Sequence, residues 1–274
     1  MMKMISVGDN VADCYVDDHL FYPGGNAVNV AVNCKRRGFD EVAYIGIFGN
    51  DVKAQHIKNS LTQEQVNFQL SRTVYAPSGQ PRVTINNEGD RVFLPGPRNS
   101  AQHLFKLRLT EEDLNYIRSF DVCHSSCYSS LEDELPKIAE RCEVSFDFSE
   151  FKDPTYIKKV CPYVKYAFFS GSDLSEEEIS TLQALCHECG TEIVGVTRGS
   201  KGACFSKNGN QYNQSINEVN VVDTMGAGDS FIAGFLTSYV KDQNIESALS
   251  FAAESAAITC TVNGGFGYPH PIEE

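Results

Sequence analysis

The chain has no long apolar run and comparatively few basic residues. No stretch approaches the roughly 18 apolar residues of a membrane-spanning helix, and the apolar segment at residues 4–7 is too short for a secretion signal, so we expect neither. Lys and Arg number 23 against 36 Asp and Glu, which gives a net charge of −13. This charge disfavours nucleic acid as a partner, although it leaves room for a local nucleotide site.

The cysteines show no spacing typical of a disulfide framework. There are ten in 274 residues, and without a secretion signal the expected setting is the reducing cytoplasm. Cys186 and Cys189 form a Cys-x-x-Cys pair, but a second ligand pair at suitable spacing is missing. Zinc binding is therefore disfavoured.

Two common phosphate-binding motifs are also missing. No Gly-x4-Gly-Lys-Ser/Thr occurs, which excludes a P-loop protein. The glycines at 226 and 228 do not continue into Gly-x-Gly-x-x-Gly because position 231 is Phe. A dinucleotide fold, and with it an oxidoreductase, is therefore disfavoured.

What the chain does contain is an alternation of strand-like and helix-like segments. This alternation predicts an α/β fold in which helices cover a mostly parallel sheet. The length is typical of one large domain with a small appendage. The expected strands are 4–7, 42–47, 122–124, 144–148, 164–169 and 193–197, and the expected helices are 27–37, 110–118, 130–141, 153–161, 175–189 and 245–261.

Two segments interrupt this rhythm, at about 12–22 and 72–98. The second contains alternating residues on either side of a turn at 87–90, which is typical of a β-hairpin. Together they predict a small β-flap that closes over a substrate and excludes water. An ordinary edge hairpin and a dimer surface remain alternatives.

The most informative stretch is Asp-Thr-Met-Gly-Ala-Gly-Asp at 223–229. We expect a short strand at 219–222 before it and a buried helix at 230–240 after it. Gly226, Ala227 and Gly228 can bring backbone N–H groups close to an anion at the helix start. Asp229 beside them can accept a proton, which suits phosphoryl transfer, although a purely structural turn stays open.

Other polar residues follow the predicted strands, where ligands bind in open α/β sheets. Asp9 and Asp13 come after the first strand and can accept hydrogen bonds from polyol hydroxyls. Gly24, Gly25 and Asn26 open the next helix, and Asn29 shares a helix face with Asn26. Together they predict a sugar-binding corner, although helix capping explains each residue taken alone.

A further strand end leads into a turn that contains Thr197, Gly199 and Gly202. This turn could lie against a nucleotide. Residues 203–206 look like a returning strand, so a simple hairpin is the alternative.

With these motifs together, the chain resembles the ribokinase-like sugar kinases of the phosphofructokinase-B family, over nearly its whole length. The signature at 223–229 is complete, and Gly24, Gly25, Asn26, Asn29 and Ala31 match a second signature. The resemblance implies a three-layer αβα fold spanning 1–274 as one domain with a β lid. It also implies ATP and Mg²⁺ as cofactors and leaves activation by a monovalent cation open.

The resemblance also implies roles for individual residues. Asp229 would be the general base, and Gly226 to Gly228 would form the anion hole. Asp13, Gly25 and Asn26 would hold the sugar. Asp223 and Thr224 would lie on the nucleotide side, and the lid would form a homodimer interface.

Within the family, the sequence is most similar to fructoselysine 6-kinases, which phosphorylate the 6-hydroxyl of a glycated lysine. Phe146, Asp147, Phe148 and Ser149 contribute to this similarity. A fructokinase, another ketose or nucleoside kinase, and a non-catalytic sugar-binding or nucleotide-binding regulator are the alternatives. One departure concerns the metal: Ser170, Gly171, Ser172 and Asp173 stand where many members have Asn-x-x-Glu, so Asp173 is the candidate metal ligand.

Overall fold

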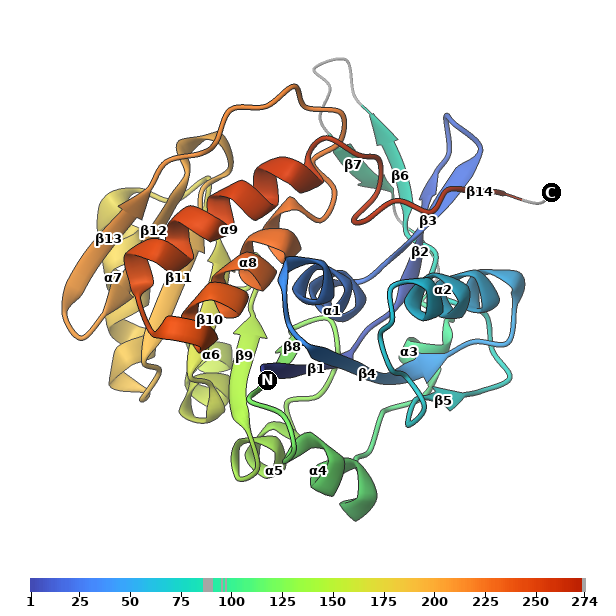
Figure 1. The fold of residues 1–274 in the computed structure, drawn as a ribbon, viewed down its shortest axis with the longest axis horizontal. Coiled ribbons are helices and arrows are strands. Elements are labelled where there is room, and N and C mark those ends of the chain that lie inside the picture. The colour runs from blue at the N-terminus through green and yellow to red at the C-terminus, as the bar shows by residue number, and fades with distance from the viewer. Residues whose placement is uncertain (86–90, 95, 97, 273–274) are drawn as a thin grey trace.

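The computed structural model describes residues 1–85, 91–94, 96 and 98–272, and these residues build two sheets (Figure 1). The larger sheet has nine strands, parallel from β5 to β11, with β12 and β13 added in antiparallel fashion. In spatial order the strands are β13 (Asn210–Gln214), β12 (Ala203–Lys207), β11 (Ile193–Thr197), β10 (Tyr166–Ser170), β9 (Glu143–Asp147), β8 (Val122–Ser126), β1 (Lys3–Gly8), β4 (Glu41–Phe48) and β5 (Arg72–Thr73).

Helices cover both faces of this sheet, which confirms the predicted three-layer αβα architecture (Figure 1). One face carries α1 (Asn26–Arg37), α2 (Val52–Gln63), α8 (Ala227–Asp242) and α9 (Ile245–Thr259). The other carries α3 (Ala101–Leu104), α4 (Glu111–Ile117), α5 (Leu135–Ala139), α6 (Pro154–Val160) and α7 (Glu176–Glu188). Short 3₁₀ turns lie at η1 (Cys161–Tyr163) and η2 (Gly199–Lys201).

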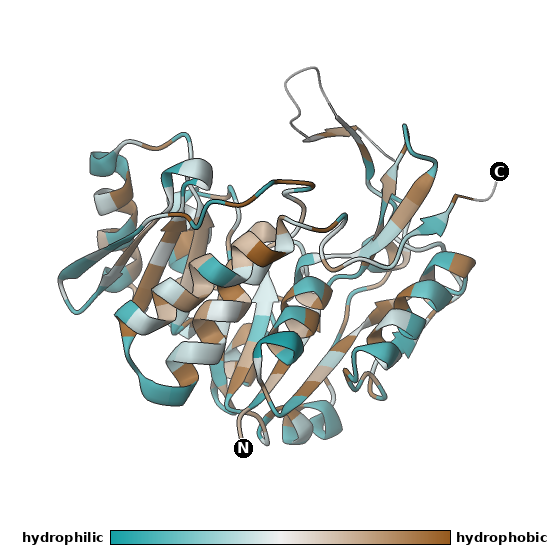
Figure 2. Ribbon diagram, turned by 45° about the horizontal axis from the view of Figure 1, so that its top comes forward, coloured by the Kyte–Doolittle hydropathy of each residue, from teal (hydrophilic) through white to brown (hydrophobic). Residues whose placement is uncertain are grey.

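Successive side chains of a strand point to opposite faces, so the sheet separates two cores. Met4 and Tyr44 pack on the α1 and α8 side, whereas Ile5 and Ile45 pack on the α4 and α5 side. Each large side chain buried in this way contributes about 1.5–3 kcal/mol relative to exposure. Figure 2 shows hydrophobic residues along the strands and hydrophilic residues on the outer helix surfaces.

No helix in the described part of the chain is long and apolar enough to cross a lipid bilayer.

The smaller sheet is the predicted lid. Its spatial order is β14-β3-β2-β6-β7, with β14 (His270–Pro271), β3 (Leu20–Gly24), β2 (Val11–Tyr15), β6 (Arg82–Ile85) and β7 (Arg91–Leu94). Because β2 begins directly after β1 ends, the lid stands at the carboxyl edge of the large sheet (Figure 1). Arg72 and Thr73 differ from expectation, since β5 pairs with β4 in the large sheet. The predicted turn at 87–90 lies outside the described residues.

Two predicted elements are wrong or too long. Residues 219–222 form no strand; their valines are exposed, and Val219 and Val221 line an open cleft instead of packing in a sheet. The β-branched residues here therefore line a cleft and do not pair in a sheet. The helix expected at 130–141 is only α5, Leu135–Ala139, with Pro136 in its first turn.

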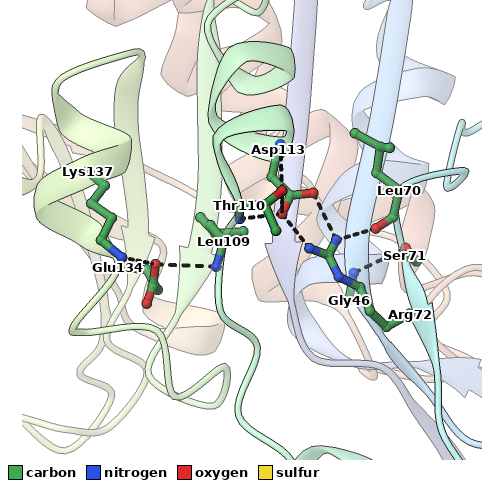
Figure 3. A network of polar contacts seen from close by, with 9 residues as sticks. All are labelled: Gly46, Leu70, Ser71, Arg72, Leu109, Thr110, Asp113, Glu134 and Lys137. Carbon is green, nitrogen blue, oxygen red and sulfur yellow. Dashed lines mark hydrogen bonds and ion pairs between the residues drawn. The ribbon is translucent and has the colours of Figure 1, made fainter.

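Polar contacts fix the ends of β5 and α4 (Figure 3). The guanidinium of Arg72 forms an ion pair with Asp113, whose Oδ1 accepts from Nη1 at 2.9 Å. Thr110 and Asp113 form a capping box at the start of α4, the helix expected at 110–118. The interaction ties an edge strand of the sheet to a helix that covers it.

Candidate active site

The first part of the site is the junction between β1 and α1. Asp9 follows β1, and its carboxylate accepts the N–H of Asn26 at 2.7 Å and the hydroxyl of Ser129 at 3.0 Å. Gly25 has φ 98°, and a Cβ there would lie 2.9 Å from Asp9 Oδ2. Asp9, which the sequence suggested as a sugar ligand, thus accepts a free backbone N–H at the start of α1. Gly25 leaves the space for its carboxylate.

Asp13 stands on β2 of the lid, with its side chain over Gly24. A Cβ on Gly24 would lie 2.0 Å from Asp13 Oδ2, so only glycine leaves space for this carboxylate. Asp13 is 4% exposed, and no hydrogen bond to its carboxylate is found among the described residues. A buried carboxylate without donors can accept the hydroxyls of a ligand.

Asp229 lies in the first turn of α8, between two asparagines of α1. Asn26 Nδ2 donates to its Oδ1 at 2.8 Å, and Asn29 Nδ2 donates to its Oδ2 at 2.7 Å. Asn26 Nδ2 also donates to Asp147 Oδ2, at the end of β9, at 2.8 Å. The structure therefore brings together the two predicted motifs and adds Asp147, which sequence analysis did not assign to the site.

Burial and mutual repulsion set the charges of these carboxyl groups. Burial, and then the charges of Asp229 and Asp9, raise the pKa of Asp13 to about 7. Burial, followed by the charge of Asp229, raises the pKa of Asp147 to about 7. Burial raises the pKa of Asp229 to about 6, against the hydrogen bonds from Asn29 and Asn26 that lower it. A carboxyl with such a pKa can exchange a proton near neutral pH.

The turn before α8 is held by Asp223. Its Oδ1 accepts the N–H of Met225 at 2.6 Å, and its Oδ2 accepts the hydroxyl of Tyr15 at 2.6 Å and the N–H of Gly264 at 2.9 Å. Asp223, predicted on the nucleotide side, is buried and organises the turn. Through Tyr15 of β2 it also links this turn to the lid.

Backbone N–H groups at the start of α8 differ in their availability. Gly226 is the N-cap with φ 71°, and the N–H of Ala227 donates to the carbonyl of Thr224 at 3.2 Å. Within the described residues, the N–H of Gly228 has no acceptor, and a Cβ on Gly228 would meet nothing within 4 Å. Gly228 is thus better placed than Ala227 to donate to an anion.

Gly228 opens onto a cleft of about 510 Å³, within the usual size range of a small-molecule site. Four residues predicted on the nucleotide side line this cleft together with Ala227: Thr197, Gly199, Gly202 and Thr224. The apolar wall of this cleft was not predicted from the sequence, although small residues recur on one side of α9. The residues of that wall are Ile216, Val219, Val221, Phe231, Ala253, Ala256, Ala257 and Cys260.

The residues that the structure describes do not form a protein cage for a metal. In the described ranges, no group of three or more His, Cys, Asp or Glu could hold a metal ion. Asp173 is exposed and pairs with Lys152 at 3.1 Å. Mg²⁺ commonly takes one or two carboxylates plus phosphates and water, so such an ion would depend largely on a bound nucleotide.

Comparison with known proteins agrees with this geometry. The pfkB family carbohydrate kinase model matches residues 2–270. The chain is 49% identical over 270 residues to fructosamine kinase FrlD of Bacillus subtilis (strain 168), covering 98% of this chain and 95% of that protein. It is 30% identical to fructoselysine 6-kinase of Escherichia coli (strain K12), covering 97% of this chain and 100% of that protein.

Among solved structures, ribokinase of Arabidopsis thaliana complexed with ribose and ATP matches with a TM-score of 0.83. Its sequence is 21% identical, and the match covers 96% of this chain and 94% of that one, so the fold is ribokinase-like. The family model covers nearly the whole chain, and the curated kinases match over nearly their whole length. The chain therefore belongs to the pfkB family of carbohydrate kinases.

Proposed function

We propose that this kinase transfers the γ-phosphoryl group of ATP to the 6-hydroxyl of a fructosamine, with fructoselysine as the leading substrate. The observation that carries the reaction is the position of Asp229, one residue after the open N–H of Gly228 at the start of α8. The substrate class is supported by the relatives at 49% and 30% identity, whose names are fructosamine kinase FrlD and fructoselysine 6-kinase.

In this proposal the sugar lies under the lid and the nucleotide lies in the cleft of about 510 Å³. Asp13 and the predicted sugar-binding corner at Asn26 orient the sugar hydroxyls. The oxygen of the attacking sugar hydroxyl bonds to the γ-phosphorus while the bond from that phosphorus to the leaving ADP oxygen breaks. Asp229 accepts the proton that the hydroxyl loses. The N–H of Gly228 and the positive end of α8 stabilise charge on the transferred group.

Mg²⁺ would enter with the nucleotide and offset phosphate charge. We propose Asp173 as the carboxylate that would bind this Mg²⁺, once its ion pair with Lys152 is broken.

The lid sheet is proposed to close over the sugar as part of one domain and to form the interface of a homodimer. Its outer strand β7 is an edge strand, and Val92 and Phe93 on it are 41% and 58% exposed. Exposed edge strands with apolar side chains favour pairing with a second copy. Sedimentation that shows a monomer at micromolar concentration would remove this part of the proposal.

The ten cysteines are free, which supports a reducing, cytoplasmic setting.

The test is ADP release with a panel of acceptors: fructoselysine, other fructosyl amino acids, fructose, ribose and nucleosides. The proposal predicts the highest kcat/KM for a fructosyl amine, and a product whose phosphate is on the 6-hydroxyl by ³¹P–¹H NMR. A preference for free fructose would assign a fructokinase instead. No ADP release above the ATP-only blank with any acceptor would contradict the proposed function.

A further inference from the structure

A buried histidine lies behind the asparagine that contacts the proposed base. His124 stands in the middle of β8 and is 0% exposed. Its Nε2 lies 2.9 Å from Asn26 Oδ1, and its Nδ1 lies 2.9 Å from Ser145 Oγ. These bonds form a chain of side chains from β9 through β8 to α1.

The surrounding carboxylates define which way the Asn26 amide faces. Asn26 Nδ2 lies 2.8 Å from oxygens of both Asp147 and Asp229, which are acceptors when ionised. Its two amide hydrogens therefore serve these oxygens, and Oδ1 must face His124 as an acceptor. A reversed amide would place Oδ1 against two carboxylates, which is repulsive.

The orientation of the Asn26 amide also fixes which ring nitrogen of His124 carries the hydrogen. Since Asn26 Oδ1 can only accept, Nε2 of His124 carries the hydrogen, and Nδ1 accepts from the hydroxyl of Ser145. Burial lowers the pKa of His124 to about 3, so the ring is neutral at working pH. A neutral ring with a fixed hydrogen is a directional donor without adding charge to the site.

We propose that His124 is a positioning residue for the phosphoryl transfer, which locks the Asn26 amide so that it donates to Asp229 and Asp147. The inference rests on the proposed function, because it needs Asp229 as the base. His124 acts only through Asn26. Its effect is to stabilise the ionised, proton-accepting form of Asp229.

The charged groups around Asp229 make this donor important. The negative charge of Asp9, after β1, raises the pKa of Asp229. The charge of Asp229 in turn raises the pKa of Asp13 on β2 and of Asp147 on β9. No Lys or Arg is hydrogen-bonded to Asp229 in the described residues. Neutral donors from Asn26 and Asn29 therefore offset the repulsion, and loss of the Asn26 donor raises the pKa of Asp229.

The experiment compares His124→Gln with His124→Asn. The amide of Gln can occupy the place of Nε2 and still donate to Asn26, whereas the shorter Asn reaches only the place of Nδ1. We expect His124→Asn to move the acid limb of the kcat/KM profile up by about one pH unit. His124→Gln should stay within about 0.3 unit of the wild type, and the nucleotide Kd should change less than about twofold in both.

His187 on α7 is the matched control, since its ring also bridges two oxygens, the backbone carbonyl of Thr191 and the hydroxyl of Ser206 on β12. His187→Asn should leave the acid limb unchanged even where it lowers the melting temperature as much as His124→Asn does. The inference is overturned if a folded His124→Asn variant has its acid limb of kcat/KM at the same pH as the wild type. It is also overturned if His124→Gln and His124→Asn shift this limb equally, because donation to Asn26 would then not be the cause.

A direct readout separates this inference from the proposed function. The pKa of the Asp229 carboxyl is measured by ¹³C NMR in the unliganded protein, with Asp229→Asn assigning the resonance. If that pKa rises in His124→Asn although no sugar is phosphorylated, the proposed function fails and the positioning of Asn26 by His124 stands. If sugar is phosphorylated and the Asp229 pKa does not move, only the role of His124 fails.

Discussion

The amide of Asn26 donates to Oδ1 of Asp229 at 2.8 Å, across a sequence separation of 203 residues. This bond joins the first turn of α1 to the first turn of α8. Each residue belongs to one of the two signatures that sequence analysis singled out. Their contact brings the predicted sugar-binding corner and the predicted anion-binding turn together.

Gly228→Ala separates stability from activity. Its Cβ would meet no protein atom within 4 Å, and alanine favours a helix over glycine by roughly 1 kcal/mol, so the melting temperature should hold or rise. The added methyl group would occupy the space where a phosphate approaches the N–H. We expect kcat/KM for ATP to fall by about 10²-fold. An active, equally stable variant would show that phosphate does not pack against Gly228.

The rate should depend on pH through Asp229. Burial raises the pKa of this carboxyl to about 6, and only the ionised form accepts a proton. We expect kcat/KM for the sugar to rise about tenfold per unit at acid pH and to level off above about pH 7. Measurement from pH 5 to 9 with saturating ATP checks this. A flat profile between pH 5 and 7 would argue against Asp229 as the titrating base.

Asp13 should lower the stability of the unliganded protein at alkaline pH. Its folded-state pKa of about 7 lies above the ordinary value of 3.8, so the native state binds more protons between these values. Stability from this group is therefore lost as pH rises through about 7. We expect Asp13→Asn to be more stable than wild type by on the order of 2 kcal/mol at pH 8, with the gain shrinking toward pH 4.

Urea denaturation at several pH values measures this difference. Asp18→Asn is the control, since Asp18 is exposed in the turn of the same lid hairpin. A gain for Asp13→Asn that does not depend on pH would mean that lost carboxyl ionisation is not its cause.

Tyr15→Phe tests whether the lid is coupled to the anion-binding turn. The change removes a 2.6 Å hydrogen bond to Asp223 and keeps the ring. We expect kcat to fall by about tenfold, because the turn that presents Gly228 loses one anchor, with a stability loss of about 1–2 kcal/mol. Tyr22→Phe is the control, since its ring packs edge-on against Tyr15 at 5.0 Å. Equal kcat values for the two variants would contradict the coupling.

Much of the fold could be predicted from sequence because periodicity and capping are local. The helices expected from 110 and 175 begin there, each with a capping box, and the strand at Ile193–Thr197 appears as expected. The segment at 219–222 was mistaken for a strand because valines that line a cleft look like valines that line a sheet. Burial depends on what the rest of the chain places beside them.

The site was predictable where motifs carry it and not where topology does. Asp229, Asn26 and Asn29 were assigned from their signatures, and the structure brings them together. Asp147 and His124 reach the same cluster only because β8 pairs with β1 and β9 pairs with the other edge of β8. Sequence analysis had placed both near strand ends or within strands, but a single strand does not reveal its neighbours.

The most direct test of the account is Asp229→Asn, which keeps the shape of the side chain and removes the proton acceptor. With the preferred fructosyl amine, the account predicts a fall in kcat of about 10²–10⁴-fold. Calorimetry should at the same time show a nucleotide Kd within a few-fold of wild type, since Asp229 does not line the cleft proposed for the nucleotide. A folded Asp229→Asn enzyme with kcat within a few-fold of wild type would contradict the assignment of Asp229 as the general base.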